Sequence, residues 1–459
     1  MSNETRIAIE PPIPLGTGPA RNLTDRFLSL FTEVRSGEGI GALLLAVNVY
    51  LLLEAYYILK TVREALILSE GSPEIKAYSS AAQAALLLLI IPAYGLFASK
   101  VNRDRLIATV TIFFAFHLAI FYVAGRAGYS VGIVFFLWVG IFNLLVIAQF
   151  WALANDLYNK EQGKRLLPIV GIGSSLGAWL GSIHAAKLFP VFGTYGLMLI
   201  ASGLLVLCVA VNRLVKRFPK SFSKAGQSSG EVPLGRDGAF RLILNSRYLF
   251  WIAMLMLVLN VVNTTGEFIL SKLVVDNADR LIASGVASVE QKPELIATFY
   301  GSFFSWVNLA GMLFQLFLVS RIFKYIGVRG ALFILPVIAF ASYGLVTVLP
   351  VLGLVRIAKV MENGTDYSIQ NTARHALFLP TSREAKYKAQ AAIDSFFWRA
   401  GDVVAAGLVF AGAHFGFAVQ RYAAINMACA VIWIAIVAVI AREHKKLEPA
   451  SGPQGDAEV

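Results

Sequence analysis

Charged residues are scarce in this sequence. Asp, Glu, Lys and Arg make up 15% of its 459 residues, against roughly 25% in an average soluble domain. Hydrophobic residues make up 57%, and many apolar runs exceed the roughly 18 residues that a helix needs to cross a bilayer. The runs lack the two-residue alternation of a barrel strand, and only helices and closed barrels satisfy every backbone polar group in lipid. The sequence therefore predicts an all-α membrane protein.

Cysteine and histidine are scarce as well. The two cysteines, Cys208 and Cys429, each lie inside an apolar run, which predicts small packing residues and no disulfide framework. The five histidines show no metal-ligand spacing, and the phosphate-binding loop of an ATP-hydrolysing pump does not occur. No nucleophile stands beside a general base. These absences predict a protein that is not an enzyme and that holds no metal and no cofactor.

One glycine-rich stretch, residues 171–181, looks at first sight like a nucleotide-binding loop. Its glycine spacing differs from that of such a loop, and it lies inside an apolar run. Gly173, Gly177 and Gly181 recur every four residues, which is the spacing of a seam where two membrane helices approach closely. The stretch therefore predicts helix packing.

The apolar runs predict twelve membrane-spanning helices. A polar, basic linker separates the sixth run from the seventh and divides the chain into two halves of six. The predicted spans are 40–67, 77–98, 106–124, 130–155, 166–189, 194–212, 248–274, 295–319, 326–346, 349–373, 391–414 and 418–441. The predicted segments are a cytoplasmic N-terminal segment (1–36), an N-terminal six-helix bundle (37–212), a cytoplasmic central loop (213–247), a C-terminal six-helix bundle (248–441) and a cytoplasmic tail (442–459).

The basic residues predict the orientation of these helices, because cytoplasmic loops carry an excess of Lys and Arg. Such residues gather before the first span, after the last, and in the loops after spans two, four, eight and ten. Both termini are therefore predicted to be cytoplasmic, in a multi-pass protein of the bacterial inner membrane. The net charge of +12 then reflects topology and not binding to nucleic acid. The polar N-terminus has no apolar region of a cleaved signal peptide, and we expect a monomer in the lipid bilayer.

The two halves resemble each other in sequence. The first span contains Tyr57-Ile-Leu-Lys60, and the seventh contains Phe268-Ile-Leu-Ser-Lys272. The basic loops also fall at corresponding places in the two halves. This internal repeat predicts two pseudo-symmetric bundles of the major facilitator type, with a substrate site near the midplane between them.

Ionisable side chains inside the predicted spans are costly and are usually functional. Lys60, Arg63 and Glu64 share one face of a helix by their spacing. Three interpretations stay open: such residues form salt bridges that gate the cavity, contact substrate directly, or reach to the membrane interface. A cavity rich in Lys and Arg favours an anionic small molecule, because both side chains bind phosphate oxygens.

The candidate residues fall into three groups. The predicted substrate-binding cations are Lys60, Arg63, Lys272, Lys359, Arg374 and Arg399. The predicted gating or proton-coupling acids are Glu64, Glu267, Glu362, Asp366, Asp394 and Asp402. The candidates for stacking on a base are Tyr56, Tyr57, Trp151 and Trp398.

Several stretches resemble the ATP:ADP antiporter family, the nucleotide transporters of plastids and obligate intracellular bacteria, together with their bacterial relatives. They are residues 57–71, 150–173, 260–273 and 373–394. The resemblance implies the exchange of nucleotides, typically cytosolic ADP against external ATP, or the uptake of other nucleotides.

The resemblance also implies roles for individual residues. Those that match charged positions of the family's first, seventh and tenth spans are Lys60, Arg63, Glu64, Glu267, Lys272 and Arg374. The chain departs from the family at Asp402, which stands about where plastid and parasite members carry a lysine. It also lacks the acid that many members carry in the fourth span.

Three hypotheses follow. The first is a secondary active transporter that exchanges nucleotides or related organic phosphates by alternating access. The second is a proton-coupled transporter of the same fold for a different, anionic solute. The third is a membrane scaffold that transports nothing, which would not require charges inside the spans.

Overall fold

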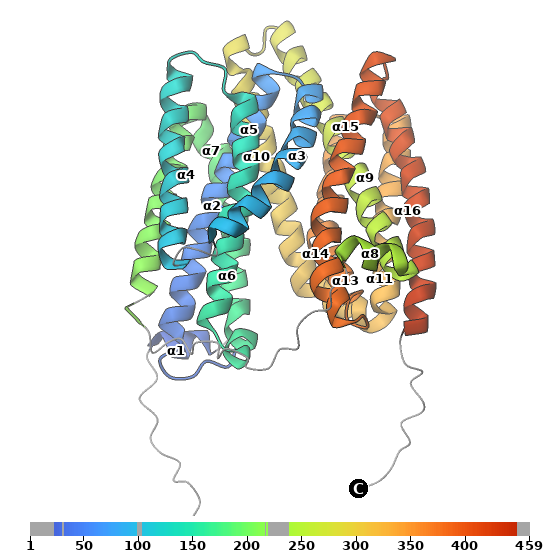
Figure 1. Ribbon diagram of the computed structural model, residues 1–459. Coiled ribbons are helices and arrows are strands. Elements are labelled where there is room, and N and C mark those ends of the chain that lie inside the picture. Colours follow the sequence, from blue (N-terminus) through green and yellow to red (C-terminus); the bar gives the residue numbers. More distant parts are fainter. Residues whose placement is uncertain (1–22, 30–31, 99–102, 216, 219–237, 448–459) are drawn as a thin grey trace, which may run out of the picture.

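The computed structural model describes residues 23–29, 32–98, 103–215, 217–218 and 238–447. Most of the predicted cytoplasmic N-terminal segment, central loop and tail lies outside these residues. In the described part of the chain every regular element is helical, as the sequence predicts. The helices stand side by side, with the N-terminal half (blue to green) next to the C-terminal half (yellow to red) (Figure 1).

The N-terminal half begins with the short helix α1 (Leu23–Leu28). Its long helices are α2 (Gly39–Glu70), α3 (Pro73–Ala98), α4 (Arg103–Arg126), α5 (Gly132–Phe142), α6 (Ala148–Leu157) and α7 (Lys160–Val215). A π-helical turn, η1 (Asn143–Ile147), joins α5 to α6.

The C-terminal half begins with the short helix α8 (Ala239–Asn245). Its other helices are α9 (Arg247–Ala283), η3 (Val289–Gln291), α10 (Lys292–Leu313), α11 (Val319–Val348), α12 (Leu352–Thr365), α13 (Asn371–Ala376), α14 (Gln390–Ala392), α15 (Trp398–His414) and α16 (Val419–Leu447). Its π-helical turns are η4 (Phe314–Leu318), η5 (Asp366–Gln370), η6 (Ala385–Ala389) and η7 (Ile393–Phe397).

Nine helices of the described chain are long and apolar enough to cross a membrane. Two of them, of 55 and 60 residues, are far longer than a bilayer is thick, and they bend at Gly193 and Gly327. Counting each as two crossings, and adding the helical stretch from Leu352 to Ala376, recovers the twelve predicted crossings. That count stays a prediction. The chain is a multi-pass α-helical membrane protein.

Left-handed glycines mark equivalent connections of the predicted repeat. Gly193 (φ 65°) lies between predicted spans five and six, Gly416 (φ 62°) lies between spans eleven and twelve, and Gly327 (φ 67°) lies at the start of predicted span nine. A side chain with a Cβ is strained in this region, so glycine is the residue that allows the turn. Connections that recur every three helices are those expected of three-helix units nested within each half.

Two of the π-helical turns, η1 and η5, fall at equivalent places in the two halves, whereas η4 and η7 interrupt predicted spans eight and eleven. η1 interrupts predicted span four and η5 interrupts predicted span ten, which are equivalent helices of the two halves. A π-helical turn inserts an extra residue into an α-helix and is often found at functional sites.

The glycine seam of α7 packs against α2, as the four-residue spacing predicts. A Cβ at Gly173, Gly177 or Gly181 would collide with the backbone of Ala46, Tyr50 or Glu54, which are themselves four residues apart. The two helices therefore meet backbone to backbone, and the prediction of a packing seam is confirmed.

This seam predicts a stability difference between two glycine variants. The change Gly177→Ala places a methyl group 2.9 Å from the Cα atom of Tyr50, whereas Gly171 has open space around it. We expect G177A to be about 1–3 kcal/mol less stable than G171A, the usual cost of overpacking. Both variants gain the same helix propensity, so thermal unfolding in detergent isolates the packing cost. Equal melting temperatures would contradict a close seam.

Candidate functional site

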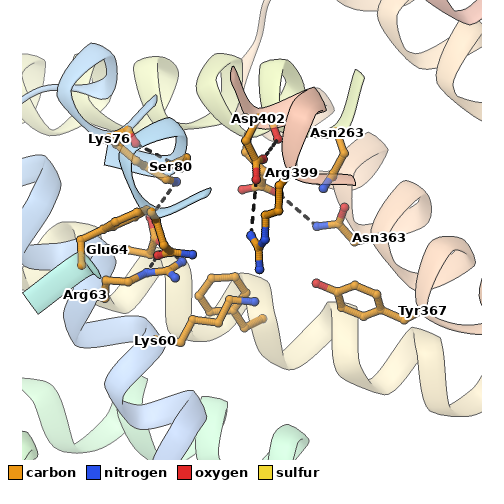
Figure 2. A pocket seen from close by; sticks show the side chains of 15 residues that line it. Lys60, Arg63, Glu64, Lys76, Ser80, Asn263, Asn363, Tyr367, Arg399 and Asp402 are labelled. Carbon is orange, nitrogen blue, oxygen red and sulfur yellow. Dashed lines mark hydrogen bonds and ion pairs between the residues drawn. The ribbon is translucent and has the colours of Figure 1, made fainter. Parts of the chain in front are cut away.

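A cavity of about 190 Å³ lies between the two halves. Figure 2 shows side chains converging on it from α2 and α3 on one side and from α9, α12 and α15 on the other. Its walls are formed by Lys60, Arg63, Glu64, Lys76, Ser80, Gln83, Phe136, Asn263, Thr264, Glu267, Phe304, Asn363, Tyr367, Arg399 and Asp402. The wall is charged and is formed by helices of both halves, and its role as a substrate site stays a prediction.

Lys60 differs from the other cations of the cavity in its partners. Its ammonium lies 4.2 Å from the centre of the Phe304 ring and 5.2 Å from that of Tyr57. Among the described residues it forms no ion pair and no hydrogen bond. Aromatic faces attract a cation only weakly compared with a carboxylate, so the charge of Lys60 is available to an anion in the cavity.

Glu64 is the buried centre of an ion-pair cluster. Its side chain is 1% exposed, and it pairs with Arg63 and, at 2.6 Å, with the ammonium of Lys76 on α3. The guanidinium of Arg63 also stacks over the ring of Phe136, 4.6 Å from its centre. The two cations compensate the cost of burying the carboxylate.

Lys76 also links the two halves. Its ammonium donates to the hydroxyl oxygen of Ser271 on α9 at 2.8 Å, and that hydroxyl lies 2.9 Å from the hydroxyl of Tyr300 on α10. A second cross-half contact is the ion pair between Lys272 and Glu74, at 3.5 Å. Both contacts lie near the turn between α2 and α3, at the end of the bundle opposite α1 (Figure 1).

The sequence prediction missed Lys76 because the predicted second span starts at residue 77. The helix in fact begins at Pro73, and proline in the first turn of a helix is a known start signal. That signal would have placed Lys76 inside the membrane helix, where a lysine is expected to pair with a buried acid.

Arg399 and Asp402 form the charged wall of α15. They pair at 3.4 Å, and the other oxygen of Asp402 accepts hydrogen bonds from Asn260 and Thr264 on α9, each at 2.9 Å. The aspartate thus ties α15 to α9 within the C-terminal half. The guanidinium of Arg399 remains on the cavity wall (Figure 2).

Lys359 lies behind the cavity wall. It is 1% exposed and pairs with Glu362 at 3.2 Å and with Glu267 at 3.7 Å. Its ammonium also donates to Asn263 at 3.1 Å, and Glu362 accepts a hydrogen bond from Tyr343 at 2.9 Å. This network holds α9 and α12 together, while Glu267 also faces the cavity.

The other predicted residues lie outside the cavity wall. Arg374 is 3.8 Å from Asp394 and donates to Asn371 at 2.8 Å, and its guanidinium lies 6.0 Å from the ring of Trp398. Asp366 begins the turn η5. The predicted residues that do not line the cavity are Lys272, Lys359, Arg374, Glu362, Asp366, Asp394, Tyr56, Tyr57, Trp151 and Trp398. Their roles stay predictions.

Neutral polar side chains of the wall were also missed. Ser80, Gln83, Asn263, Thr264 and Asn363 offer amides and hydroxyls to a solute. Their signal in the sequence is weak, because Ser, Thr and Asn occur in many membrane helices as packing or hydrogen-bonding residues. The exposed side chain of Tyr367 and the largely buried ring of Phe304 add aromatic surface to the same wall.

The cavity wall carries a small excess of positive charge. Four cations (Lys60, Arg63, Lys76 and Arg399) face three acids (Glu64, Glu267 and Asp402), which leaves one positive charge when all are ionised. A solute that balances this wall is an anion. Because the cavity lies between the two halves, an anion bound in it would contact both.

The ion pair between Glu64 and Lys76 predicts strong coupling in a double-mutant cycle. Glu64→Gln or Lys76→Met alone leaves a buried charge poorly compensated, at a cost of about 3–5 kcal/mol, while the double variant should lose much less than the sum. Thermal unfolding in detergent measures the cycle. The half-exposed pair of Glu74 and Lys272 is the control and should couple by about 0–1 kcal/mol. Additive losses at Glu64 and Lys76 would refute the pairing.

No family model matches this chain. Solved structures similar to it include a bacterial homologue of the human lysosomal transporter Spinster, in an inward-facing and unoccupied conformation (TM-score 0.61, 13% identity, 91% of this chain and 100% of that chain). The transporter PepTSo of the POT family (TM-score 0.62, 10% identity, 89% and 98%) and the nucleoside transporter NupG (TM-score 0.58, 12% identity, 89% and 98%) are also similar. These similarities show the fold, a helical membrane fold of the major facilitator type.

Curated relatives are distant in sequence. ADP,ATP carrier protein 5 of Rickettsia prowazekii is 22% identical over an alignment covering 83% of this chain and 88% of the relative. ADP,ATP carrier protein 1 of Chlamydia trachomatis is 20% identical over 340 residues, 64% of this chain. The chain spans about three fifths of the length of this chlamydial relative (61%).

Proposed function

We propose that this chain is a secondary active transporter that exchanges nucleotides or related organic phosphates across the bacterial inner membrane. The observation that carries the proposal is the cavity between the two halves, in which Lys60 has no acidic partner among the described residues. The names of the relatives in Rickettsia and Chlamydia supply the solute class. The chain works as a monomer, with both termini cytoplasmic, and carries its solute chemically unchanged.

In this proposal the cations of the cavity have different tasks. Lys60 offers a point charge from α2, and Arg63 and Arg399 offer planar forks that suit phosphate oxygens. The amides and hydroxyls of α9 and α12 can then contact the rest of the solute. Phosphate oxygens would compete with Glu64 for Arg63 and with Asp402 for Arg399, so solute binding would loosen the ion pairs of the empty cavity.

The size of the cavity limits what it encloses. Pockets that bury a drug-sized ligand usually measure about 300–1,000 Å³, and this cavity measures about 190 Å³. It therefore suits a phosphate group, while a whole nucleotide requires the halves to separate further. A single excess positive charge also favours weakly charged anions over a triphosphate.

The contacts that join the halves at one end support alternating access. Lys76 to Ser271 and Lys272 to Glu74 hold them together at the end opposite α1, which is the external face in the proposed orientation. Opening the cavity to that face requires these contacts to break. Water can satisfy the same hydrogen-bonding groups once the contacts break, so the opening is a reversible step.

Removing the charge of Lys60 tests the site. Lys60→Gln should lower uptake by about tenfold or more, the loss expected for a hydrogen bond to a charged group. Proteoliposomes loaded with unlabelled AMP, ADP, ATP or inorganic phosphate would measure counterflow of the labelled solute. Lys187→Gln is the control, since Lys187 is exposed on α7, away from the cavity. Wild-type uptake in K60Q would exclude Lys60 from the site, and no counterflow across the panel would exclude the proposed solute class.

A proton-coupled transporter of another anion is the second candidate. Its supporting observation is the carboxylate of Glu267, which faces the cavity while touching Lys359 at 3.7 Å and accepting from Asn363 at 3.1 Å. Protonation there would release Lys359 and Asn363 from one carboxylate oxygen. A solute could then enter together with a proton.

A pH gradient separates the two candidates. A proton-coupled carrier should take up solute faster when the outside is more acidic, and Glu267→Gln should remove that stimulation because its side chain cannot titrate. Glu290→Gln, a change of an exposed acid in η3 outside the cavity wall, is the control and should keep the stimulation. If uptake by the wild type does not depend on the pH gradient, the proton-coupled candidate is excluded and exchange remains.

A further inference from the structure

One arginine of the second half has no role in the cavity. Arg356 lies in the second turn of α12, and among the described residues it forms no ion pair. Its guanidinium donates to the hydroxyl oxygen of Ser302 on α10 at 2.7 Å and lies 5.4 Å from the centre of the Phe299 ring. An arginine offers five N–H donors, so most of them remain for another acceptor.

A groove on the outside of the bundle contains this arginine in its lining. It has a volume of about 460 Å³ and is lined by Trp306, Gly353, Arg356, Ile357, Val360 and Met361. The side chains of Trp306, Ile357 and Met361 are 56%, 64% and 40% exposed. Except for Arg356 the lining is apolar, and large apolar side chains exposed on a membrane helix face lipid.

The groove and the arginine are ordered along the membrane normal. α10 and α12 both start at the same end of the bundle, where α12 follows a short connection from α11. Phe299 and Ser302 precede Trp306 on α10, and Arg356 precedes Val360 and Met361 on α12. The charged end therefore lies nearer the membrane surface and the apolar part lies deeper, which is the order of headgroup and acyl chain in a phospholipid.

We propose that this groove binds an anionic phospholipid of the leaflet in which α12 begins. The lipid phosphate would accept hydrogen bonds from Arg356, whose planar fork suits phosphate oxygens, and one acyl chain would lie between α10 and α12. A free phosphate would leave the apolar groove unused. Simple snorkelling of Arg356 to the surface fits less well, because Ser302 on the neighbouring helix holds the guanidinium at the head of the groove.

The site serves a different purpose from the cavity. α10 contacts α7 and α2 of the opposite half and α12 of its own half, so a lipid wedged between α10 and α12 would restrain a helix of the interface between the halves. The lipid composition of that leaflet would then influence transport without any lipid entering the cavity.

Native mass spectrometry of the detergent-purified full chain tests the proposal, with phosphatidylglycerol and phosphatidylcholine as probes. Wild type should retain one phosphatidylglycerol more tightly than phosphatidylcholine. Arg356→Gln should weaken phosphatidylglycerol binding by about tenfold, the loss expected for a charge-assisted hydrogen bond. Arg421→Gln is the matched control, since Arg421 is an exposed arginine stacked 5.4 Å from the Phe417 ring centre, and it should bind as wild type does.

A second variant tests the groove itself. Gly353 has open space around its Cα atom, so Gly353→Leu should fill the groove without disturbing the fold, and it should weaken binding of both lipids while Arg356 is intact. Equal binding of phosphatidylglycerol by wild type, R356Q and G353L would overturn the proposal. Equal affinity of wild type for the two lipids would overturn the choice of an anionic headgroup. If R356Q fails to fold, G353L alone decides.

Discussion

The requirement that a charge inside a bilayer must find compensation governs this structure. Glu64 is buried in the middle of the protein and is acceptable there only because Arg63 and Lys76 surround it. That requirement brings α3 against α2, and the same ammonium reaches Ser271 in the other half. Lys60 differs from Arg63 and Lys76, because its charge lies against aromatic rings on the cavity wall and not against a carboxylate. The cavity is therefore most easily completed by an anion.

The charges of the cavity are divided unequally between the halves. The N-terminal half supplies Lys60, Arg63, Lys76 and one acid, whereas the C-terminal half supplies Arg399 and two acids, Glu267 and Asp402. The two walls thus carry net charges of opposite sign. They attract each other when the cavity is empty, and an anion between them satisfies the N-terminal wall while it weakens the attraction. Such a change in the balance between open and closed states is what a solute must supply to a carrier, since a ligand shifts an equilibrium only by its preference for one state.

The sequence predicted the helices well because each apolar run is long and continuous, and it predicted the seam of α7 because glycine spacing translates directly into close approach. It predicted the cavity residues less well. In an unbroken α-helix Lys359, Glu362 and Asp366 would share one face, and the first two do pair, but the π-helical turn η5 begins at Asp366 and changes the register. Neutral wall residues such as Asn263 and Asn363 carry no signal that separates a solute contact from a structural hydrogen bond.

The seam between α2 and α7 has a mechanical consequence. The backbones of α2 and α7 interlock at three glycines, so a displacement of α7 would carry the charged end of α2 with it. α7 in turn meets α10 through small groups: a Cβ at Gly301 would lie 2.9 Å from Ala186, and Asn308 donates to the carbonyl of Ala178 at 3.1 Å. The contact between α7 and α10 has little side-chain bulk to resist rotation, so the two halves would rotate against each other there. The glycines of the seam between α2 and α7 would then transmit a tilt of α7 to α2, and so displace Lys60.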